Sequence, residues 1–290
     1  PETAALADLR QRGARGLFCR LCRHRLRREV LSVMNRYAAE VSYDGGKFFG
    51  WQIQPELPTV QQALEEAISK INGRHTPVAG AGRTDTGVHA KGQVCSFDMA
   101  REWEPRRLLL AANAHLPEGV SLMRAAAVRG DFHARFSAKE REYRYFIWNA
   151  SAIYPHIVGK VCWIKPQRYD WGAAAAAAKE LLGSHDFRNF CRLEGNEQST
   201  VRKITKIRLI DRRPLVVLQI KGDGFLHNMV RIILGNLEMA ALGQISPPQI
   251  RELLNTEKSS RSDGGRTFPA CGLYLWKISY GEKLWQTGRP

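Results

Sequence analysis

Long hydrophobic runs are missing from this 290-residue sequence. No apolar stretch approaches the roughly 20 residues that a helix needs to cross a bilayer, so we expect no membrane-spanning segment. Cysteine is also scarce, with six residues scattered along the chain. A chain of this length does not need disulfides to fold, so this usage indicates a reducing compartment, and we expect a cytoplasmic protein.

Motifs for metals and phosphate-bearing cofactors are lacking as well. Cys19 and Cys22, followed by His24, have half of the spacing of a zinc site, but no second Cys or His pair follows at a suitable distance. No glycine-rich loop of the kind that cradles phosphates is present. We therefore expect neither a metal nor a cofactor.

Acidic residues are few relative to basic ones. The chain has 44 Lys and Arg against 28 Asp and Glu, and its formal net charge is +16. Such a surplus favours polyanionic partners, nucleic acid first and acidic membrane surfaces second. The 44% hydrophobic and 25% charged content is typical of a folded protein with one large core or two smaller ones.

The first 33 residues differ from the rest, because eight arginines there oppose only three acidic residues. Three interpretations compete: an arm that contacts RNA, an Arg-rich targeting peptide, or a stretch that is not naturally translated and precedes a start at Met34. We favour the third, because the strand pattern begins directly after Met34. Residues 1–33 are therefore predicted to be a disordered or non-native extension.

The remaining chain alternates strand and helix patterns in two parts. We expect an α+β fold in which residues 34–136 and 137–290 form two similar subdomains, with mainly antiparallel sheets that meet at a central RNA-binding cleft. Thr59, with Gln62 three residues later, predicts a capping box at one helix start. The other expected helices cover 107–114, 173–182 and 225–242. The expected strands cover 37–43, 94–97, 120–127, 142–148, 204–210 and 215–220.

The most informative stretch, residues 82–90, reads Gly-Arg-Thr-Asp-Thr-Gly-Val-His-Ala. Its glycines predict a tight loop whose backbone comes close to a ligand. Its single carboxylate, Asp85, follows Arg83, whose permanent charge favours an ionised carboxylate and can hold a phosphate. By itself the pattern allows two interpretations: an ordinary turn in which Asp85 bonds its own backbone, or a nucleophile acting on a nucleotide.

This motif resembles the signature of the TruA family of tRNA pseudouridine synthases. Five further segments resemble family elements in the same order, and together they cover nearly all of the chain after the extension. They are 49–52 (Phe-Gly-Trp-Gln), 136–145 (Phe-Ser-Ala to Arg-Glu-Tyr-Arg-Tyr), 185–190 (His-Asp-Phe to Phe), 224–231 (Gly-Phe-Leu-His-Asn-Met-Val-Arg) and 272–275 (Gly-Leu-Tyr-Leu). Thr86 departs from the alanine of many members, a small change that should preserve the loop.

The resemblance implies an enzyme that converts uridine to pseudouridine without a cofactor. Asp85 would be the nucleophile, attacking C1′ of the ribose or C6 of the uracil, with Arg231 beside it. Tyr143 would stack on the extruded base and could shuttle the C5 proton. Leu273 would form an apolar wall, and Arg83 would contact a phosphate or support Asp85. The alternatives are a surface charge for Arg231 and core packing for Tyr143 and Leu273.

The resemblance also implies the partners. The compact core is similar to the bacterial enzymes that act on the tRNA anticodon arm at positions 38, 39 and 40, and family members are homodimers. Two alternatives remain: a synthase for other tRNA or RNA positions, and a catalytically silent RNA chaperone. His89, which closes the motif, is expected to be a structural hydrogen-bonding residue.

Overall fold

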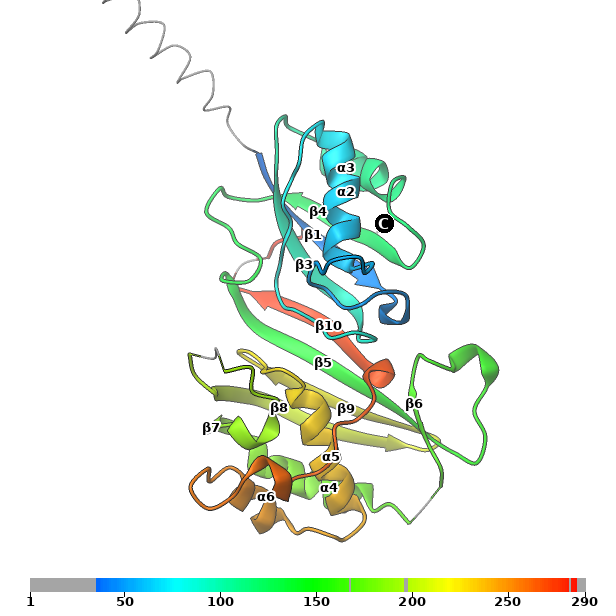
Figure 1. Cartoon of the computed structure of the whole chain (residues 1–290), viewed down its shortest axis with the longest axis vertical. Coiled ribbons are helices and arrows are strands. Elements are labelled where there is room, and N and C mark those ends of the chain that lie inside the picture. Colours follow the sequence, from blue (N-terminus) through cyan, green and yellow to red (C-terminus); the bar gives the residue numbers. More distant parts are fainter. Residues whose placement is uncertain (1–34, 167, 196–197, 282, 286–290) are drawn as a thin grey trace, which may run out of the picture.

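A computed structural model describes residues 35–166, 168–195, 198–281 and 283–285. The expectations for residues 1–33, including the Cys19–Cys22–His24 spacing, lie outside this range. The upper part of the molecule in Figure 1 comes from the first half of the chain and the lower part from the second half. Within the described residues, no helix is long and apolar enough to cross a membrane.

The first half supplies four strands and two helices. They are β1 (Asn35–Tyr43), α2 (Val60–Asn72), β2 (Ala79–Gly80), β3 (His89–Met99), α3 (Pro105–Asn113) and β4 (Val120–Ala127). The Thr59 side chain caps α2 by accepting from the Gln62 backbone N–H at 3.4 Å. The reciprocal half of the predicted capping box does not form, because the Gln62 amide donates to Glu66 instead, at 2.9 Å.

The second half supplies six strands and three helices. They are β5 (Ala138–Asn149), β6 (Cys162–Ile164), α4 (Trp171–Ala178), β7 (Gly183–Asp186), β8 (Val201–Arg212), β9 (Leu215–Gly222), α5 (Met229–Ala241), α6 (Pro247–Leu253) and β10 (Leu273–Tyr280). The strands predicted over 204–210 and 215–220 are present and pair as the antiparallel strands β8 and β9. The helix predicted over 173–182 ends earlier, in a 3-10 turn, and Gly183 begins a strand.

One sheet joins the two halves. Its order is β4-β1-β3-β10-β5-β9-β8-β7, with β2 paired to β3 and β6 to β5. The last strand, β10, lies between β3 and β5, parallel to the first and antiparallel to the second. Most of the other pairs are antiparallel, so the expected α+β class with a mainly antiparallel sheet is confirmed. The boundary at residue 136 stays a prediction.

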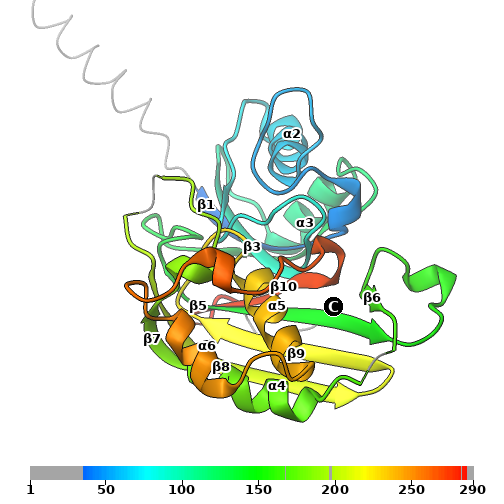
Figure 2. The same ribbon diagram turned by 60° about the horizontal axis from the view of Figure 1, so that its bottom comes forward.

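The sheet brings distant parts of the chain together beneath the helices. Leu275 of β10 lies opposite Tyr143 of β5, and Tyr274 lies opposite His89 of β3. The same hydrophobic core runs through both halves, from Tyr37 on β1 to Leu237 on α5. Figure 2 shows α5 lying over β9 close to β10, so the start of α5 is positioned over the middle of the sheet.

The predicted start of the long helix in the second half is wrong. The apolar pattern predicted a helix over 225–242, but α5 begins only at Met229. Asn228, at its N-cap, has the left-handed conformation with φ of 61°, which interrupts the helical path. The ring of Phe225 instead packs edge-on against Tyr143, with centroids 5.1 Å apart. Tertiary contacts thus override the amphipathic pattern at this end of the helix.

Candidate active site

The motif at residues 82–90 forms a turn between β2 and β3. The Asp85 carbonyl accepts from the Val88 N–H at 3.1 Å, and Gly87 has φ of +80° at the third position of this turn. Such a φ is easy only for glycine, as a type II turn requires. The Thr84 carbonyl accepts from the Trp51 N–H at 3.1 Å. The backbone of the loop is therefore held on both sides of Asp85.

The Asp85 side chain is aimed away from its own backbone. Its carboxylate faces two side chains of the second half: Oδ2 lies 3.3 Å from Nη1 of Arg231, and Oδ1 lies 3.5 Å from Nε2 of His227. The carboxyl side chain is 31% exposed, so solvent and a ligand can reach it. The turn interpretation is right for the backbone, but the carboxylate itself pairs across the seam between the two halves.

Arg231 is held in place by groups other than Asp85. Its Nε donates to the Phe268 carbonyl at 2.6 Å, and its Nη1 donates to Oδ1 of Asn228 at 2.7 Å. The Phe268 N–H in turn donates to the Arg231 carbonyl at 3.2 Å. With its side chain only 17% exposed, Arg231 is not a surface charge. A guanidinium with several fixed donors has a defined orientation, and it presents positive charge to Asp85.

Tyr143 lies under the same site. Its ring is buried against Phe225, and its hydroxyl lies 4.0 Å from where a Cβ on Gly82 would stand. Burial raises the pKa of Tyr143, and the negative charge of Asp85 raises it further. A raised pKa keeps the phenol protonated at neutral pH. In this state the hydroxyl has a proton that it can donate.

The first-half side of the site is reinforced by buried polar contacts. The Thr84 hydroxyl lies 2.7 Å from the hydroxyl of Tyr43, and both side chains are buried. His89 accepts from the Gly45 N–H at 3.0 Å through Nδ1, and its Nε2 lies 3.1 Å from the Gly159 carbonyl. Its ring also stacks on Tyr274. The prediction of a structural role for His89 is confirmed by these contacts.

Two of the predicted site residues do not join the cluster. Arg83 is exposed and has no hydrogen bond or ion pair to another residue that the structure describes. Leu273 is buried in the sheet, where it lies opposite Tyr145. The contacts of Arg83 with a phosphate and of Leu273 with uracil stay predictions.

His227 is the neighbour of Asp85 that sequence reasoning missed. In the sequence it belongs to the segment 224–231, and the pattern of that segment assigns it no role. A signal was present, because His227 precedes Arg231 by four residues, the spacing of side chains that share one side of a helix. In the structure, His227 belongs to the turn before α5, and its Nδ1 lies 2.7 Å from Oε1 of Glu194.

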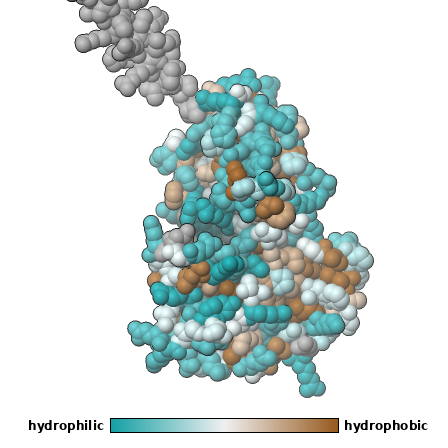
Figure 3. All heavy atoms as spheres, viewed as in Figure 1, coloured by the Kyte–Doolittle hydropathy of each residue, from teal (hydrophilic) through white to brown (hydrophobic). Residues whose placement is uncertain are grey.

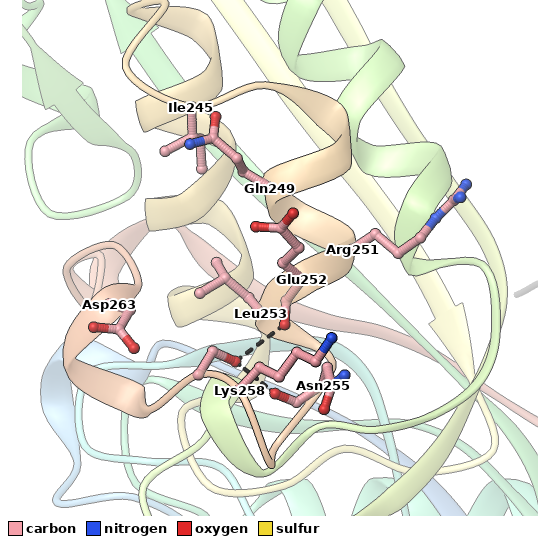
Figure 4. Close-up of a pocket in the computed structure, with 9 residues that line it drawn as sticks. Ile245, Gln249, Arg251, Glu252, Leu253, Asn255, Lys258 and Asp263 are labelled. Atoms are coloured by element: carbon pink, nitrogen blue, oxygen red, sulfur yellow. Dashed lines mark hydrogen bonds between the residues drawn. The ribbon is translucent and has the colours of Figure 1, made fainter.

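A separate cavity lies around α6, away from this cluster. It has a volume of about 730 Å³ and is lined by side chains of both charges, among them Glu252 and Lys258. Figure 4 shows Glu252, Asn255 and Lys258 around this cavity. The Ser259 hydroxyl lies 3.1 Å from the Glu252 carbonyl oxygen and 2.8 Å from that of Asn255. None of its lining residues belongs to the motif or contacts Asp85. The chemistry therefore concentrates at the seam and not at this cavity.

Known proteins are similar to most of this chain. The sequence model of a family described as tRNA pseudouridine synthase matches residues 39–137 and 177–281. Proteins named tRNA pseudouridine synthase A are similar over most of their length. The one from Shouchella clausii is 39% identical over 89% of this chain and 98% of that protein. The one from Methylacidiphilum infernorum is 40% identical over 84% of this chain and 95% of that protein.

The relative from Bacillus subtilis is 39% identical over 84% of this chain and 99% of that protein. A solved structure of a Cbf5–Nop10–Gar1 complex aligns with a TM-score of 0.30 and 12% identity over 70% of this chain and 54% of that chain, which is too low to support a conclusion. The family match includes the Asp85 loop and the Arg231 helix, the two elements whose charges meet at the seam. This chain belongs to the tRNA pseudouridine synthase family.

Proposed function

We propose that this isomerase converts uridine to pseudouridine in the anticodon arm of tRNA, at positions 38, 39 and 40, with Asp85 as the nucleophile. The observation that carries the proposal is the Asp85 carboxylate itself, partly exposed and paired with Arg231 at 3.3 Å. Asp85 is the single carboxylate of the motif that resembles the family signature. The relatives of this chain are named tRNA pseudouridine synthase A. The anticodon positions follow from the family resemblance alone.

The reaction needs only groups that the site holds. The N1–C1′ bond breaks, the base rotates, C5 bonds to C1′, and the proton lost from C5 is balanced by the proton that N1 gains. No atom is gained or lost overall, so the reaction needs no co-substrate that donates or accepts a chemical group. Asp85 forms a transient bond to C1′ or C6, and Arg231 stabilises its charge before and after that step. Tyr143, held protonated, relays a proton near the base.

A target uridine in an RNA arm must leave its stack before it reaches Asp85. The proposal assigns contact with the extruded base to Tyr143, and stacking on an aromatic ring contributes about 1–3 kcal/mol per base. Leu273 would line the base, and Arg83 would hold a phosphate; the exposure of Arg83 is consistent with this role. With a net charge of +16, tRNA binding should weaken steeply as salt increases.

The proposal includes a homodimer in a reducing, cytoplasmic setting. Exposed apolar side chains gather on the segment that leads into and includes β6: Tyr154, Val158 and Trp163 are 58%, 59% and 45% exposed. Figure 3 shows hydrophobic residues collected at this margin, whereas most of that face is hydrophilic. Such a patch fits a contact with a second copy of the chain. Cys95, Cys162 and Cys271 are free thiols.

The test is Asp85→Asn. We expect this substitution to reduce pseudouridine formation at positions 38–40 at least about 1,000-fold, with tRNA affinity within a few-fold of the wild type. Pseudouridines would be mapped in tRNA transcripts, and affinity measured by filter binding. Asp131→Asn is the matched control, because Asp131 is an exposed carboxylate that pairs with the exposed Arg129. Substantial activity in Asp85→Asn would contradict the mechanism.

The alternatives give different results in the same assay. A synthase for other positions would modify tRNA or another RNA outside positions 38–40, and this modification would still require Asp85. A catalytically silent chaperone would form no pseudouridine, and its cellular effect would survive Asp85→Asn unchanged.

A further inference from the structure

The two oxygens of the Asp85 carboxylate face different partners. Arg231 lies at Oδ2, at 3.3 Å, and His227 lies at Oδ1, at 3.5 Å. The proposed reaction uses Arg231 to balance the carboxylate charge but leaves His227 without a role. An imidazole that faces the reacting oxygen of a nucleophile must influence how that oxygen is presented.

His227 is itself held on its far side. Its Nδ1 lies 2.7 Å from Oε1 of Glu194, and its backbone carbonyl accepts from the Arg192 N–H at 3.0 Å. The loop that includes Glu194 thus contacts the turn before α5 through both a side chain and the backbone. Nδ1 lies beside the Glu194 carboxylate as a close charge contact without the alignment of a hydrogen bond, and the opposite nitrogen, Nε2, lies on the side of Asp85.

The protonation state of an imidazole determines how many of its nitrogens can donate a hydrogen bond. A neutral imidazole has one N–H donor and one lone pair, whereas the imidazolium ion donates from both nitrogens. Only the imidazolium can therefore donate to Glu194 and Asp85 at the same time. A carboxylate behind a histidine commonly orients the ring toward the group that it serves.

The contact with Asp85 is long for a hydrogen bond, and the His227 side chain is 29% exposed. Catalytic hydrogen bonds are often long without substrate and shorten when the substrate binds. His227 is not locked in a core, so a small rotation of its ring can complete or release the contact. The left-handed Asn228 that follows it ends the turn and starts α5, which places His227 and Arg231 on either side of one carboxylate.

We propose that His227 is a positioning residue for Asp85, with its imidazole oriented by Glu194 so that Nε2 holds Oδ1 while Arg231 holds Oδ2. The two contacts fix the plane of the carboxylate and leave a second lone pair on each oxygen free to attack. This inference rests on the proposed role of Asp85 as the nucleophile.

Two amide substitutions test the geometry directly. The side-chain amide nitrogen of Gln reaches the position of Nε2, and that of Asn reaches the position of Nδ1. His227→Gln therefore retains a donor toward Asp85, whereas His227→Asn retains one only toward Glu194. We expect the single-turnover rate to fall about 10- to 100-fold in His227→Asn and only a few-fold in His227→Gln, with KM within about twofold in both.

Glu194→Gln provides a variant that leaves His227 in place. It keeps the shape of the side chain but removes the charge behind the imidazole, and we expect a rate lowered about 3- to 10-fold with KM unchanged. Thermal unfolding of each variant verifies that it is folded. If His227→Asn does not fold, the single-turnover rate of Glu194→Gln still tests whether His227 positions Asp85.

Three outcomes would overturn the inference: equal rates in the Gln and Asn variants, a raised KM at unchanged rate, or a wild-type rate in Glu194→Gln. These outcomes differ from a failure of the proposed function. In that case the wild-type protein itself would form no pseudouridine in tRNA, or Asp85→Asn would remain active.

Discussion

The two sides of the seam hold their functional residues in different ways. On the first-half side, the Asp85 loop is fixed by its backbone, through the Val88 turn and the carbonyl that Trp51 bonds. On the second-half side, Arg231 and His227 are fixed mainly by side-chain contacts with Asn228 and Glu194 and by the Phe268 carbonyl. Main-chain contacts determine where the carboxylate stands, and side chains from far along the sequence determine the charge around it.

The effect of a substitution should therefore depend on which side of the seam it changes. A change on the second-half side should alter the chemistry and spare the fold, because it removes a charge or a donor. A change in the packing behind the Asp85 loop should disturb the fold and the chemistry together, because the backbone of the loop itself must shift.

Apart from Asp85 itself, the largest effect is expected from the charge on the second-half side. Arg231→Ala should reduce the rate of pseudouridine formation on the order of 100-fold, because Asp85 loses the donor that balances its charge. Arg231→Lys should recover little, since an ammonium cannot serve Phe268, Asn228 and Asp85 together. Single-turnover kinetics measure both, with the exposed Arg251→Ala as control. A Lys variant as fast as the wild type would show that charge alone matters.

The next effect should come from packing behind the loop. A Cβ on Gly45 would stand 2.1 Å from the Val88 carbonyl oxygen, and a backbone atom cannot move aside as a flexible side chain can. Gly45→Ala should lower the free energy of unfolding by about 1–3 kcal/mol and also slow the reaction. Urea unfolding measures this, with Gly130→Ala as control because Gly130 faces open space. Equal stability of the two variants would contradict the backbone-held description.

A smaller effect is expected where RNA binding can be separated from chemistry. Phe136 is 75% exposed, its ring contacts His133, and the Arg135 guanidinium lies over it at 5.7 Å. A cation beside an exposed ring suits stacking by a nucleotide base. Phe136→Ala should weaken tRNA binding about 5- to 10-fold, leaving the rate at saturating tRNA unchanged. Leu110→Ala, which removes an apolar side chain that is 63% exposed, should change neither.

The smallest effect concerns the pH dependence of stability. Burial lowers the pKa of His89, and the nearby Asp44 only partly opposes this. Below the ordinary pKa of histidine, the unfolded chain then binds more protons at this position than the folded one, so stability falls as pH decreases from 7.5 to 5.5. His89→Gln should show a weaker decrease. Unfolding free energies in urea at both pH values test this, and equal decreases would exclude His89 as a source.

Local patterns predicted most of the elements. The strand expected over 120–127 coincides with β4, and Thr59 is the N-cap of α2 as expected. These succeeded because a cap and a two-residue alternation depend on neighbours in sequence. The start of α5 failed for the opposite reason. Its apolar pattern extends back to Phe225, but residues 225–228 lie outside the helix, where Phe225 packs against Tyr143 and His227 faces Asp85.

The same division applies to the site. The motif, together with the five segments that resemble family elements in the same order, identified Asp85, Arg231 and Tyr143. The structure brings these three residues together. Arg83 and Leu273 belong to the same matched segments, yet among the described residues no hydrogen bond or ion pair joins Arg83 to Asp85, and Leu273 lies buried in the sheet opposite Tyr145. Membership in a motif indicates that a residue matters, but it does not say which way the side chain points.

The sequence by itself determined the family, the carboxylate and the helix that carries its arginine, because these are read from the identity and order of residues. Only the tertiary structure decided that β10 joins the two halves in one sheet, and that His227 and Glu194 stand behind Asp85. The physical reason is that Asp85 and Arg231 are 146 positions apart. Contacts over such a separation depend on how the sheet and α5 pack, and no local pattern encodes that packing.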